Sequence, residues 1–439
     1  MAVSIEDFLK GPLATDGPGA ERAARLLRRR RGTIHEAEEA GTTARKSKSY
    51  ELASPEPLFD YQADVVASLT KARSDGVRSA MVSIPTGGGK TRTALWYIRK
   101  AIQDQTCRRA VWLAPSAELV AQAERTAQDL WRTFSPSPRT TLVLNDLEPP
   151  VARSDQLTPL LAIATVQLAA KRVDALRALQ PDLVVYDEAH QAAARTSRDI
   201  VRALGDIEGC MLVGLSATPG RTLTDENELL SGLFGGNLIV PRVLGHDAIA
   251  TLVGRGVLAH VETRQIPLPR QWDALRVRST NAPSLSLDEL ALEPHRFWAI
   301  ADTIEEIARK RRCLVFGSSI AHCEVIAAVA NARNIRAESL SHNTPADKRE
   351  LVLKLFLAGG IQVLTNKSLL MAGFDDPGLG DAVLATPIRS SIQWEQIVGR
   401  VSRGPSVGGK RSARVWELDD HSKLHDRVMA AQRFVGDTW

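Results

Sequence analysis

From Leu58 onward, short apolar runs alternate with longer stretches in which apolar residues recur every three or four positions. Continuous apolar runs predict strands that are buried on both faces, and the stretches between them predict amphipathic helices. The strands predicted in the first half cover residues 80–84, 110–114, 141–144, 160–164, 183–186 and 211–215. Helical stretches such as 117–131 and 173–179 separate them. The alternation predicts an α/β domain over residues 56–242, built on a parallel sheet.

A second series with the same rhythm occupies residues 295–425. Its predicted strands cover 313–316, 335–340, 361–364, 381–385 and 413–418, and its predicted helices cover 320–332, 345–357 and 393–401. Residues 243–294 lack the alternation and contain several prolines, so we expect them to connect the two domains, with one helix around residues 246–255. The predicted fold class is therefore α/β, with two tandem parallel-sheet domains.

The two ends of the chain differ from these domains. Residues 1–55 are predicted to be a helical and polar extension, with helices over 4–10 and 20–31. Four arginines at positions 28–31 end the second helix, and they suit either a grip on phosphates or a solvated helix end. Residues 426–439 are expected to form a C-terminal tail.

Composition narrows the class of protein. The 439 residues suffice for two or three domains that each bury a core. No apolar run approaches the roughly 18 residues needed to cross a bilayer, and the N-terminus has no apolar signal-peptide core, so we expect a cytoplasmic protein without a membrane partner. The four cysteines lack metal-ligand spacing, which predicts buried thiols in a reducing compartment and no zinc. The net charge of +5 agrees with a polyanionic partner without demonstrating one.

A glycine-rich stretch follows the first predicted strand. Residues 84–91 read Ile-Pro-Thr-Gly-Gly-Gly-Lys-Thr and lead into a helical pattern. A strand, a tight loop and a helix in this order can direct backbone N–H groups at phosphates, with Lys90 reaching the terminal phosphates and Thr91 holding Mg²⁺. The remaining phosphate-binding candidates are Thr86, Gly87, Gly88 and Gly89. Taken alone, the stretch also suits a glycine-rich hairpin, because Ile84 stands where the motif has its first glycine.

Two carboxylates follow the predicted strand over residues 183–186. Asp187 and Glu188 come directly after this apolar run, which places both at the carboxyl edge of the sheet, where sheets of this kind bind ligands. Asp187 can hold Mg²⁺, and Glu188 can orient and deprotonate an attacking water. An acidic turn after a strand is common, and the phosphate loop upstream favours a site over a plain loop. Because only one of the two domains has a phosphate loop, a cleft between them is expected.

The sequence Asp187-Glu188-Ala189-His190, together with residues 85–91, resembles the superfamily 2 helicases and translocases of the DEAH-like branch. Further motifs that resemble those of the family follow in its order at residues 61–62, 113–115, 164–167, 216–219, 314–317, 365 with 373–375, and 396–403. The resemblance covers about residues 58–420. It implies two tandem RecA-like domains with an ATP cleft between them, ATP and Mg²⁺ as cofactors, and nucleic acid as partner.

The resemblance assigns further residues to the nucleotide. Gln62 matches the adenine-recognising glutamine, whose amide can pair with the donor and acceptor edges of adenine and so favours ATP over GTP. Phe59 suits either stacking on the base or packing in the core. Arg400 and Arg403 match arginines that cross the cleft to the γ-phosphate, and their spacing predicts that both project from one face of a helix. The other residues expected at the nucleotide are Gly373, Asp375 and Gln396.

A last set is expected to couple the nucleotide to the nucleic acid. His190, Ser216 and Thr218 are candidates for relaying the state of the γ-phosphate, although His190 also suits a satisfied interior position. The residues expected to contact the nucleic-acid backbone are Pro115, Thr165, Gln167, Gly317 and Thr365. Contacts to the backbone predict binding that is independent of base sequence and sensitive to salt.

The first functional hypothesis is an ATP-dependent helicase or translocase acting on DNA, because residues 187–190 and 399–403 look more like the restriction-motor and DNA-repair branch than the RNA branch. RNA is the alternative substrate. A second hypothesis is a nucleic-acid-stimulated ATPase subunit that signals to a protein partner through residues 1–55, without processive unwinding. A P-loop kinase or metabolic ATPase would not explain the second domain with its two arginines.

Overall fold

The computed structural model describes residues 57–132, 140–143, 159–219, 224–268, 291, 293–371, 374–386, 388 and 391–418. The chain divides into two compact units, and the boundary between their main parts falls between Arg255 and Gly256. We call the unit that precedes this boundary the first unit and the one that follows it the second unit. The predicted extension over residues 1–55, the tail over 426–439 and Gly373 lie outside the described residues.

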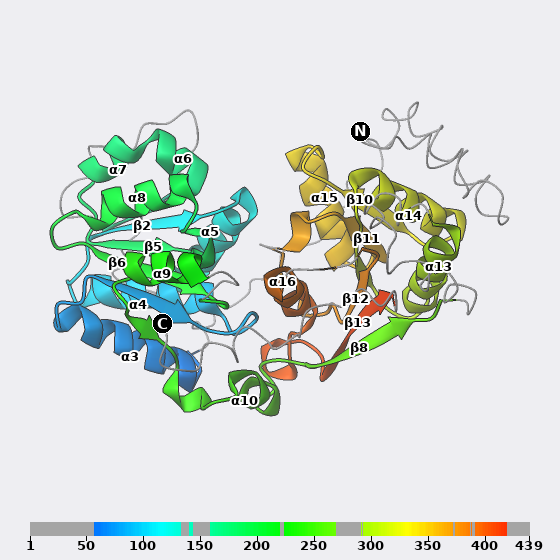
Figure 1. Ribbon diagram of the computed structural model, residues 1–439, viewed down its shortest axis with the longest axis horizontal. Helices are drawn as coiled ribbons and strands as arrows, with labels where there is room; N and C mark the ends of the chain where they lie inside the picture. The colour runs from blue at the N-terminus through cyan, green and yellow to red at the C-terminus, as the bar shows by residue number, and fades with distance from the viewer. Residues whose placement is uncertain are drawn as a thin grey trace. The chain divides into compact units, whose positions relative to one another are not determined.

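The first unit is built on a sheet of seven parallel strands (Figure 1). Its strands are β1 (Ser79–Ser83), β2 (Arg109–Ala114), β3 (Thr140–Val143), β4 (Leu160–Thr165), β5 (Leu183–Tyr186), β6 (Met211–Ser216) and β7 (Leu238–Ile239). Their order across the sheet is β3-β4-β2-β5-β6-β1-β7. The parallel sheet predicted from the apolar runs is confirmed, and the structure adds the two-residue strand β7.

Helices cover both faces of this sheet. They are α3 (Asp60–Ser74), α4 (Lys90–Gln103), α5 (Ala117–Trp131), α6 (Val166–Lys171), α7 (Val173–Ala178), α8 (Arg195–Gly205) and α9 (Thr224–Leu233). The unit also contains the short 3-10 turns η2 (Ala189–Gln191) and η3 (Arg242–Leu244), and helix α10 (Ala248–Gly254), which packs against η3. Helices α3, α4 and α5 pack side by side, while α6, α7 and α9 pack against α8 on the other face (Figure 1). The second group buries its apolar side chains against β4, β5 and β6.

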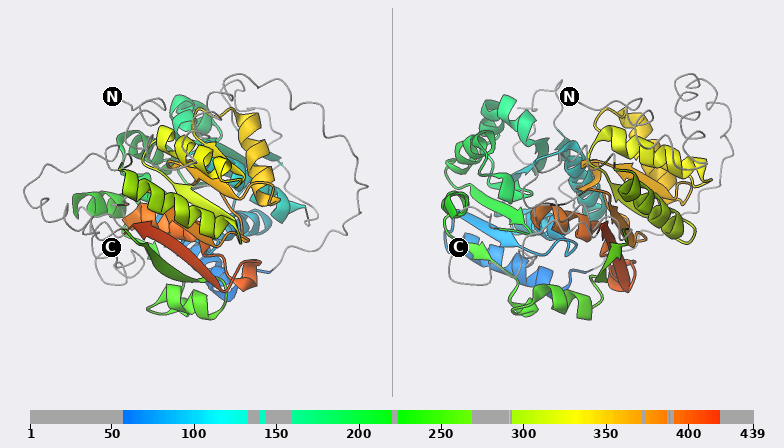
Figure 2. Two further views of the ribbon diagram at one scale, coloured as in Figure 1. Left: turned by 90° about the vertical axis from the view of Figure 1, so that its right-hand side faces the viewer. Right: turned by 45° about the vertical axis from the view of Figure 1, so that its right-hand side comes forward.

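The second unit holds a sheet of six parallel strands. These are β8 (His260–Ile266), β9 (Cys313–Phe316), β10 (Ala337–Leu340), β11 (Val363–Asn366), β12 (Asp381–Leu384) and β13 (Ser412–Leu418), in the order β10-β11-β9-β12-β13-β8. Its helices are α13 (Pro294–Ala308), α14 (Ile320–Ala332), α15 (Ala346–Leu357) and α16 (Ser391–Val401), with turns η5 (Leu369–Met371) and η6 (Pro405–Val407). Helix α13 lies over β8, β9 and β12, and Figure 2 shows β8 beside β13.

Strand β8 is a finding that the sequence pattern did not predict, since residues 260–266 fall in the expected connection. It pairs with β13 along its whole length, from His260 opposite Ser412 to Ile266 opposite Leu418. Only Ile266 of the strand is buried. An edge strand has one open side and needs no continuous apolar run, so its polar sequence gives no strand signal. The predicted helix around residues 246–255 is confirmed as α10.

The four cysteines are buried and form no disulfide, as predicted. Burial raises the pKa of both the Cys107 and the Cys323 thiol to about 12, so these side chains stay protonated at neutral pH. In the part of the chain that the structure describes, no helix has the length and apolar character needed to cross a membrane.

The ring of Phe234 packs against β6 at Gly214, and this contact gives a stability prediction. A Cβ added at Gly214, in the middle of β6, would lie 2.6 Å from two carbons of that ring. Phe234→Ala should therefore leave a cavity under β6 and lower the free energy of unfolding by about 3–5 kcal/mol. Urea unfolding followed by tryptophan fluorescence measures the change.

Leu229→Ala, on α9, is the matched control because the Leu229 side chain is 39% exposed. Its effect should stay within about 0.5 kcal/mol. Equal losses from the two substitutions would contradict the packing role given to Phe234.

Candidate functional site

The glycine-rich loop of the first unit lies between β1 and α4, as predicted. Gly87 and Gly89 have φ angles of 89° and 84°, a left-handed conformation that side chains disfavour. Gly89 is the N-cap of α4, so the helix begins at Lys90 and its first N–H groups face the loop. Lys90 is buried and Thr91 half-buried. The loop therefore has the backbone conformation of an anion cradle.

The start of α3 holds the loop from one side. The Tyr61 hydroxyl and the Gln62 side-chain amide both donate to the Gly88 carbonyl, over 2.8 and 3.1 Å. The Gln62 Oε1 accepts from the Phe59 N–H over 3.2 Å, so both ends of the predicted adenine-recognising amide already bind protein. Phe59 is half-buried and stacks on Tyr61, with ring centroids 5.7 Å apart. A Cβ at Gly89 would lie 2.5 Å from Gln62 Nε2 and would displace that amide, and the φ of 84° also disfavours a side chain there.

The hydroxyl of Tyr61 makes a site contact that the sequence did not predict. It reaches the loop across 26 intervening residues and is 0% exposed. The only signal in the sequence was its position directly before Gln62. An aromatic residue in that place reads equally well as a core residue.

The two predicted carboxylates follow β5, close to the phosphate loop in the sheet order. Asp187 is 2% exposed and Glu188 is 8% exposed. Glu188 has a φ of 51°, which is uncommon for a residue with a side chain, and its N–H donates to Asp187 Oδ1 over 3.0 Å. A backbone held in this conformation turns the chain sharply at the end of the strand.

The three predicted coupling residues lie together beside Glu188. His190 Nδ1 is 3.4 Å from Glu188 Oε2 and 3.4 Å from Ser216 Oγ. The Ser216 hydroxyl in turn accepts from the Thr218 N–H over 3.0 Å. All four side chains are buried. The geometry brings these residues into one chain of contacts, and the relay role assigned to them stays a prediction.

The residues of this edge fit a nucleotide and a magnesium ion by their chemistry. Backbone N–H groups and a buried Lys90 suit phosphates, while the Thr91 hydroxyl and the Asp187 carboxylate are oxygen ligands of the kind Mg²⁺ prefers. On its other side the loop is closely packed, because a Cβ at Gly88 would lie 2.6 Å from the Ile84 side chain.

Two predicted nucleic-acid residues lie at neighbouring strand ends of the first unit. Pro115 follows Ala114, the last residue of β2, which pairs with Thr165 at the end of β4. The Thr165 hydroxyl accepts from the Leu168 N–H over 3.2 Å and so caps α6. The Gln167 side chain is exposed. These positions share one edge of the sheet, and their contact with nucleic acid stays a prediction.

The predicted contact between the Thr365 side chain and nucleic acid disagrees with the burial of that side chain in the second unit. Thr365 is 0% exposed, and its hydroxyl donates to the Cys323 carbonyl over 2.8 Å, which ties β11 to α14. Gly317 is equally enclosed, because a Cβ there would lie 2.6 Å from Cys323 Sγ. Nearby, burial and the Arg296 guanidinium lower the pKa of His322 to about 3, so this interior histidine is neutral.

The two predicted arginines belong to the second unit, but they do not share one helix face. Helix α16 ends at Val401, so Arg400 lies on the helix and Arg403 beyond its end. The reason is local: Gly404 and Pro405 follow, and Arg403 forms a bridge with Leu258.

The Arg403 side chain binds within the same unit. Its Nε is 2.9 Å from Asp375 Oδ1, and its Nη1 donates to the Gly399 carbonyl over 2.9 Å. Arg400 is buried and Gln396 half-buried. Arg403 and Asp375, both predicted at the nucleotide, thus lie in contact with each other.

Comparison with protein families identifies both halves of the chain. Residues 56–221 match the family described as type III restriction enzyme, res subunit. Residues 296–404 match the family described as helicase conserved C-terminal domain. The two matches correspond to the unit with the glycine-rich loop and the unit with the arginines.

Individual relatives are distant. IRC3 of Saccharomyces cerevisiae, which its name provisionally calls an ATP-dependent helicase, is 22% identical over 362 residues, covering 78% of this chain and 49% of its own. A 51.5 kDa protein of a Lactococcus phage is 24% identical over 234 residues, covering 53% of this chain and 48% of its own. The chain thus spans about half the length of these relatives.

Solved structures share the fold at low identity. The type ISP restriction-modification enzyme LlaBIII bound to DNA matches with a TM-score of 0.60 and 17% identity, covering 83% of this chain and 28% of that one. Dbp5 of Saccharomyces cerevisiae bound to RNA and ADP BeF3 matches with a TM-score of 0.54 and 13% identity, covering 87% of this chain and 92% of that one. Both sheets therefore have the tandem RecA-like fold. The chain belongs to the superfamily 2 helicases, within their restriction-motor type.

Proposed function

We propose that this chain is an ATP-dependent motor on nucleic acid, with DNA as its preferred substrate. The observation that carries the proposal is the division of chemistry between the units. The first unit gathers the glycine-rich loop, two carboxylates and the His190–Ser216 contact at one sheet edge. The described residues of the second unit include no such loop, and this unit contributes Arg400 and Arg403. Membership of the helicase superfamily supports ATP hydrolysis as the reaction.

In this proposal the first unit binds ATP and activates water. The N–H groups at the start of α4 and the Lys90 ammonium hold the β- and γ-phosphates. Thr91 and Asp187 would hold Mg²⁺, which would neutralise charge on the phosphates. Glu188 accepts the proton of the attacking water, whose oxygen bonds to the γ-phosphorus while the bond to the β–γ bridging oxygen breaks. The products are ADP and inorganic phosphate.

The arginines of the second unit make hydrolysis depend on both units. We assign Arg400 and Arg403 to charge stabilisation on the transferred phosphoryl group, a contribution worth about 10³–10⁵ in rate in well-studied nucleotide hydrolases. Loss of the γ-phosphate would remove the contacts that hold the two units on one nucleotide. Alternate engagement and release would then move a bound strand stepwise. His190, Ser216 and Thr218, whose chain of contacts begins at Glu188, would transmit the state of the phosphate to the strand-binding edge.

DNA is favoured over RNA by the relatives. The first unit matches a restriction-enzyme family, and LlaBIII, the structural relative with a TM-score of 0.60, was solved with DNA. Dbp5, with a lower TM-score of 0.54, was solved with RNA, so RNA stays the alternative substrate.

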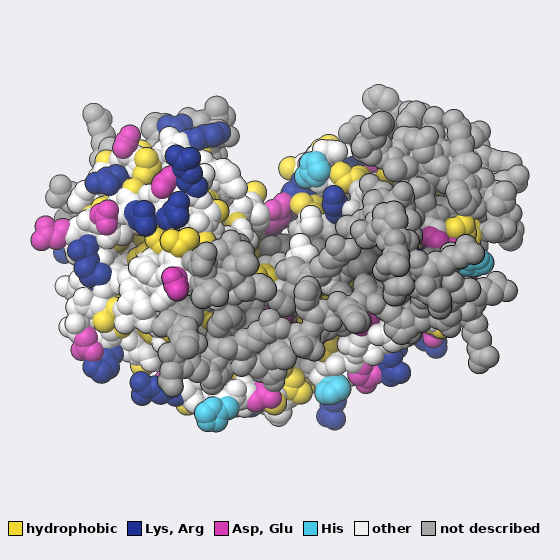
Figure 3. Space-filling model, in the orientation of Figure 1, with side chains coloured by type: hydrophobic (Ala, Val, Ile, Leu, Met, Phe, Trp, Pro, Cys, Tyr) yellow, Lys and Arg dark blue, Asp and Glu magenta, His cyan; other side chains and the backbone are white. Residues whose placement is uncertain are grey.

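A basic surface on the first unit supports a polyanionic partner. Lysine and arginine side chains gather over α6, α7 and α8 (Figure 3). The basic residues of these helices and of the turn between α6 and α7 are Lys171, Arg172, Arg177, Arg195, Arg198 and Arg202, against Asp174 and Asp199. We call this the α6–α8 basic surface. It adjoins Thr165 at the start of α6, so a strand bound at that edge could continue across it.

Removing the catalytic groups tests the reaction. Lys90→Ala should abolish measurable hydrolysis, because the phosphates lose their cation. Glu188→Gln should keep ATP binding while lowering kcat by about 10²–10⁴, since the amide cannot accept the proton. A phosphate-release assay and binding of a fluorescent ATP analogue separate the two effects. Glu208→Gln, an exposed acid of the same unit, is the control. Normal turnover by Glu188→Gln would contradict the role of Glu188.

A substrate panel tests the choice of nucleic acid. Duplex DNA, single-stranded DNA and RNA are compared as activators of hydrolysis, and displacement of a triplex-forming strand from duplex DNA reports translocation. We expect DNA to stimulate hydrolysis more than RNA and to support displacement. Stimulation without displacement would favour the signalling ATPase over the motor, and greater stimulation by RNA would overturn the substrate assignment.

Charge removal tests the α6–α8 basic surface. Changing Lys171, Arg195 and Arg202 together to Gln should weaken DNA binding and reduce the slope of log K against log salt by up to about 3, since each phosphate contact contributes about 0.9. The matched control changes Lys71, Lys100 and Arg108, which are not buried and belong to other elements of the same unit. Equal changes in slope for both triple variants would show that the effect is only one of net charge.

A further inference from the structure

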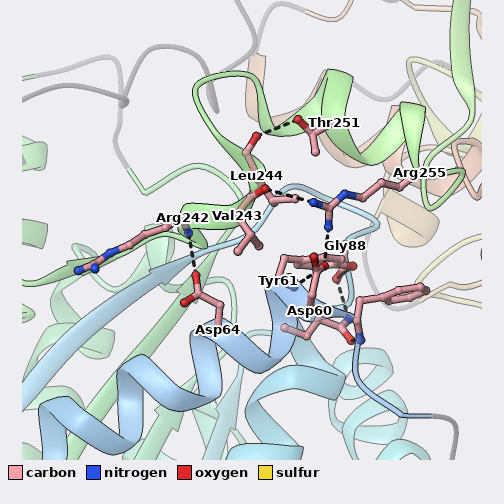
Figure 4. A network of polar contacts seen from close by, with 11 residues as sticks. Asp60, Tyr61, Asp64, Gly88, Arg242, Val243, Leu244, Thr251 and Arg255 are labelled. Carbon is pink, nitrogen blue, oxygen red and sulfur yellow. Dashed lines mark hydrogen bonds and ion pairs between the residues drawn. The ribbon is translucent and has the colours of Figure 1, made fainter.

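The last segment of the first unit folds back onto the start of α3 (Figure 4). The Arg242 N–H donates to Asp64 Oδ2 over 2.8 Å, and the Thr251 hydroxyl donates to the Leu244 carbonyl over 2.8 Å. At the end of the segment, Arg255 Nη1 is 2.5 Å from Asp60 Oδ1. Helix α3 is therefore held at two points by residues that follow it by more than 170 positions.

Arg255 fixes its own segment as well as α3. Its Nη2 donates to the Val243 carbonyl over 3.2 Å while Nη1 binds Asp60, so one guanidinium joins η3 to the first residue of α3. Asp60 Oδ1 also accepts from the Tyr61 N–H over 2.7 Å. The oxygen that binds Arg255 thus belongs to the turn that presents Tyr61 and Gln62 to the phosphate loop. Only Asp60 separates Arg255 from Tyr61 and the predicted base-binding residue Gln62.

Helix α10 touches the phosphate loop from the same segment. The Leu252 side chain is 0% exposed, and a Cβ added at Gly88 would lie 3.7 Å from Leu252 Cδ1. Gly88 is the residue whose carbonyl accepts from Tyr61 and Gln62. The segment and α3 therefore both pack on the loop that would bind phosphate.

The next residue begins the second unit and is tied to the segment that carries Arg403. The Gly256 carbonyl accepts from the Ser406 N–H over 2.8 Å, and the Val257 carbonyl accepts from the Gly404 N–H over 2.9 Å. Gly256 has a φ of 69°, and a Cβ at Gly404 would lie 2.2 Å from the Gly256 oxygen. Glycines are thus required at both positions. One peptide bond separates the contacts of Arg255 in the first unit from these contacts in the second.

From these contacts we propose that Arg255 is a positioning residue for ATP hydrolysis. Through Asp60, the last residue of the first unit is fixed to α3, the helix that carries the predicted base-binding residue Gln62. The peptide between Arg255 and Gly256 then passes any movement of α3 to the segment with Arg403. The inference rests on the proposed ATPase function and adds a path from the base site to the arginines.

The charge pair is exposed enough to separate this role from a structural one. The side chains of Arg255 and Asp60 are 36% and 61% exposed, and exposed ion pairs contribute little to stability. If the pair were merely structural, its removal would therefore change neither the unfolding midpoint nor the kinetics to a large extent. If the pair positions the site, its removal would lower turnover while the fold stays intact.

The test compares Arg255→Gln, Asp60→Asn, the double variant, and the exchange of the two residues (Asp60→Arg with Arg255→Asp) in the full chain. We expect each single variant to lower the nucleic-acid-stimulated kcat about tenfold, with KM for ATP and the urea midpoint changed much less. The double variant should be no worse than either single one, and the exchange should recover part of the rate. Arg264→Gln removes a comparable exposed pair with Glu262 on β8 and is the control.

The possible outcomes distinguish failure of the proposed ATPase function from failure of the positioning role of Arg255. Wild-type protein without stimulated hydrolysis would refute the proposed function itself. Active wild-type protein with unchanged kcat in Arg255→Gln would refute the positioning role alone. A rise in KM for ATP with unchanged kcat would also overturn it, because Arg255 would then act only on base binding.

Discussion

Parallel strands end at one common edge of their sheet, and the candidate ATP site depends on this constraint. In the first unit β6 lies between β5 and β1, so the segments that follow these three strands start side by side. These loops carry Asp187 with Glu188, Ser216, and the glycine-rich stretch. The Ile84 N–H even donates to the Ser216 carbonyl over 3.3 Å, which joins two of them directly. Residues of these three segments are far apart in the sequence but lie close together in the fold.

The polar groups at this edge are already bound to one another. The Gly88 carbonyl accepts two side-chain donors, and the buried His190 lies between Glu188 and Ser216. Buried polar groups are costly unless they are paired, so such contacts hold the loops in place before any ligand binds. A site prepared in this way would lose less entropy on binding phosphate, and it would hold Glu188 in place for the role that we propose. The left-handed backbone at Glu188 is consistent with that arrangement, since strain of this kind persists only where the surroundings enforce it.

How much the sequence predicted depends on where each side chain faces. Strand β5 and helices α5 and α14 have the predicted bounds, because continuous or periodic apolar residues report burial directly. The edge strand β8 was missed because it is polar and gains its hydrogen bonds from β13. The predicted helix face shared by Arg400 and Arg403 was wrong, because the helix ends between them. The motifs placed residues at the sheet edge correctly, but whether a side chain points inward, as Thr365 does, is set by packing that a linear pattern does not contain.

The second sheet shows why two similar units can have unequal roles. At the end of its strand β11, two polar side chains bind within the unit: Thr365 donates to the Cys323 carbonyl, while Asn366 donates to the Val315 carbonyl and accepts from the Leu370 N–H. Both side chains are fully buried. A ligand that bound through these two side chains would have to replace hydrogen bonds that are already made. The groups left to act on a ligand are those beyond the edge, on and after α16. In the function we propose, the part of the second unit that acts on the nucleotide is therefore its arginines, while the first unit provides the phosphate-binding loop.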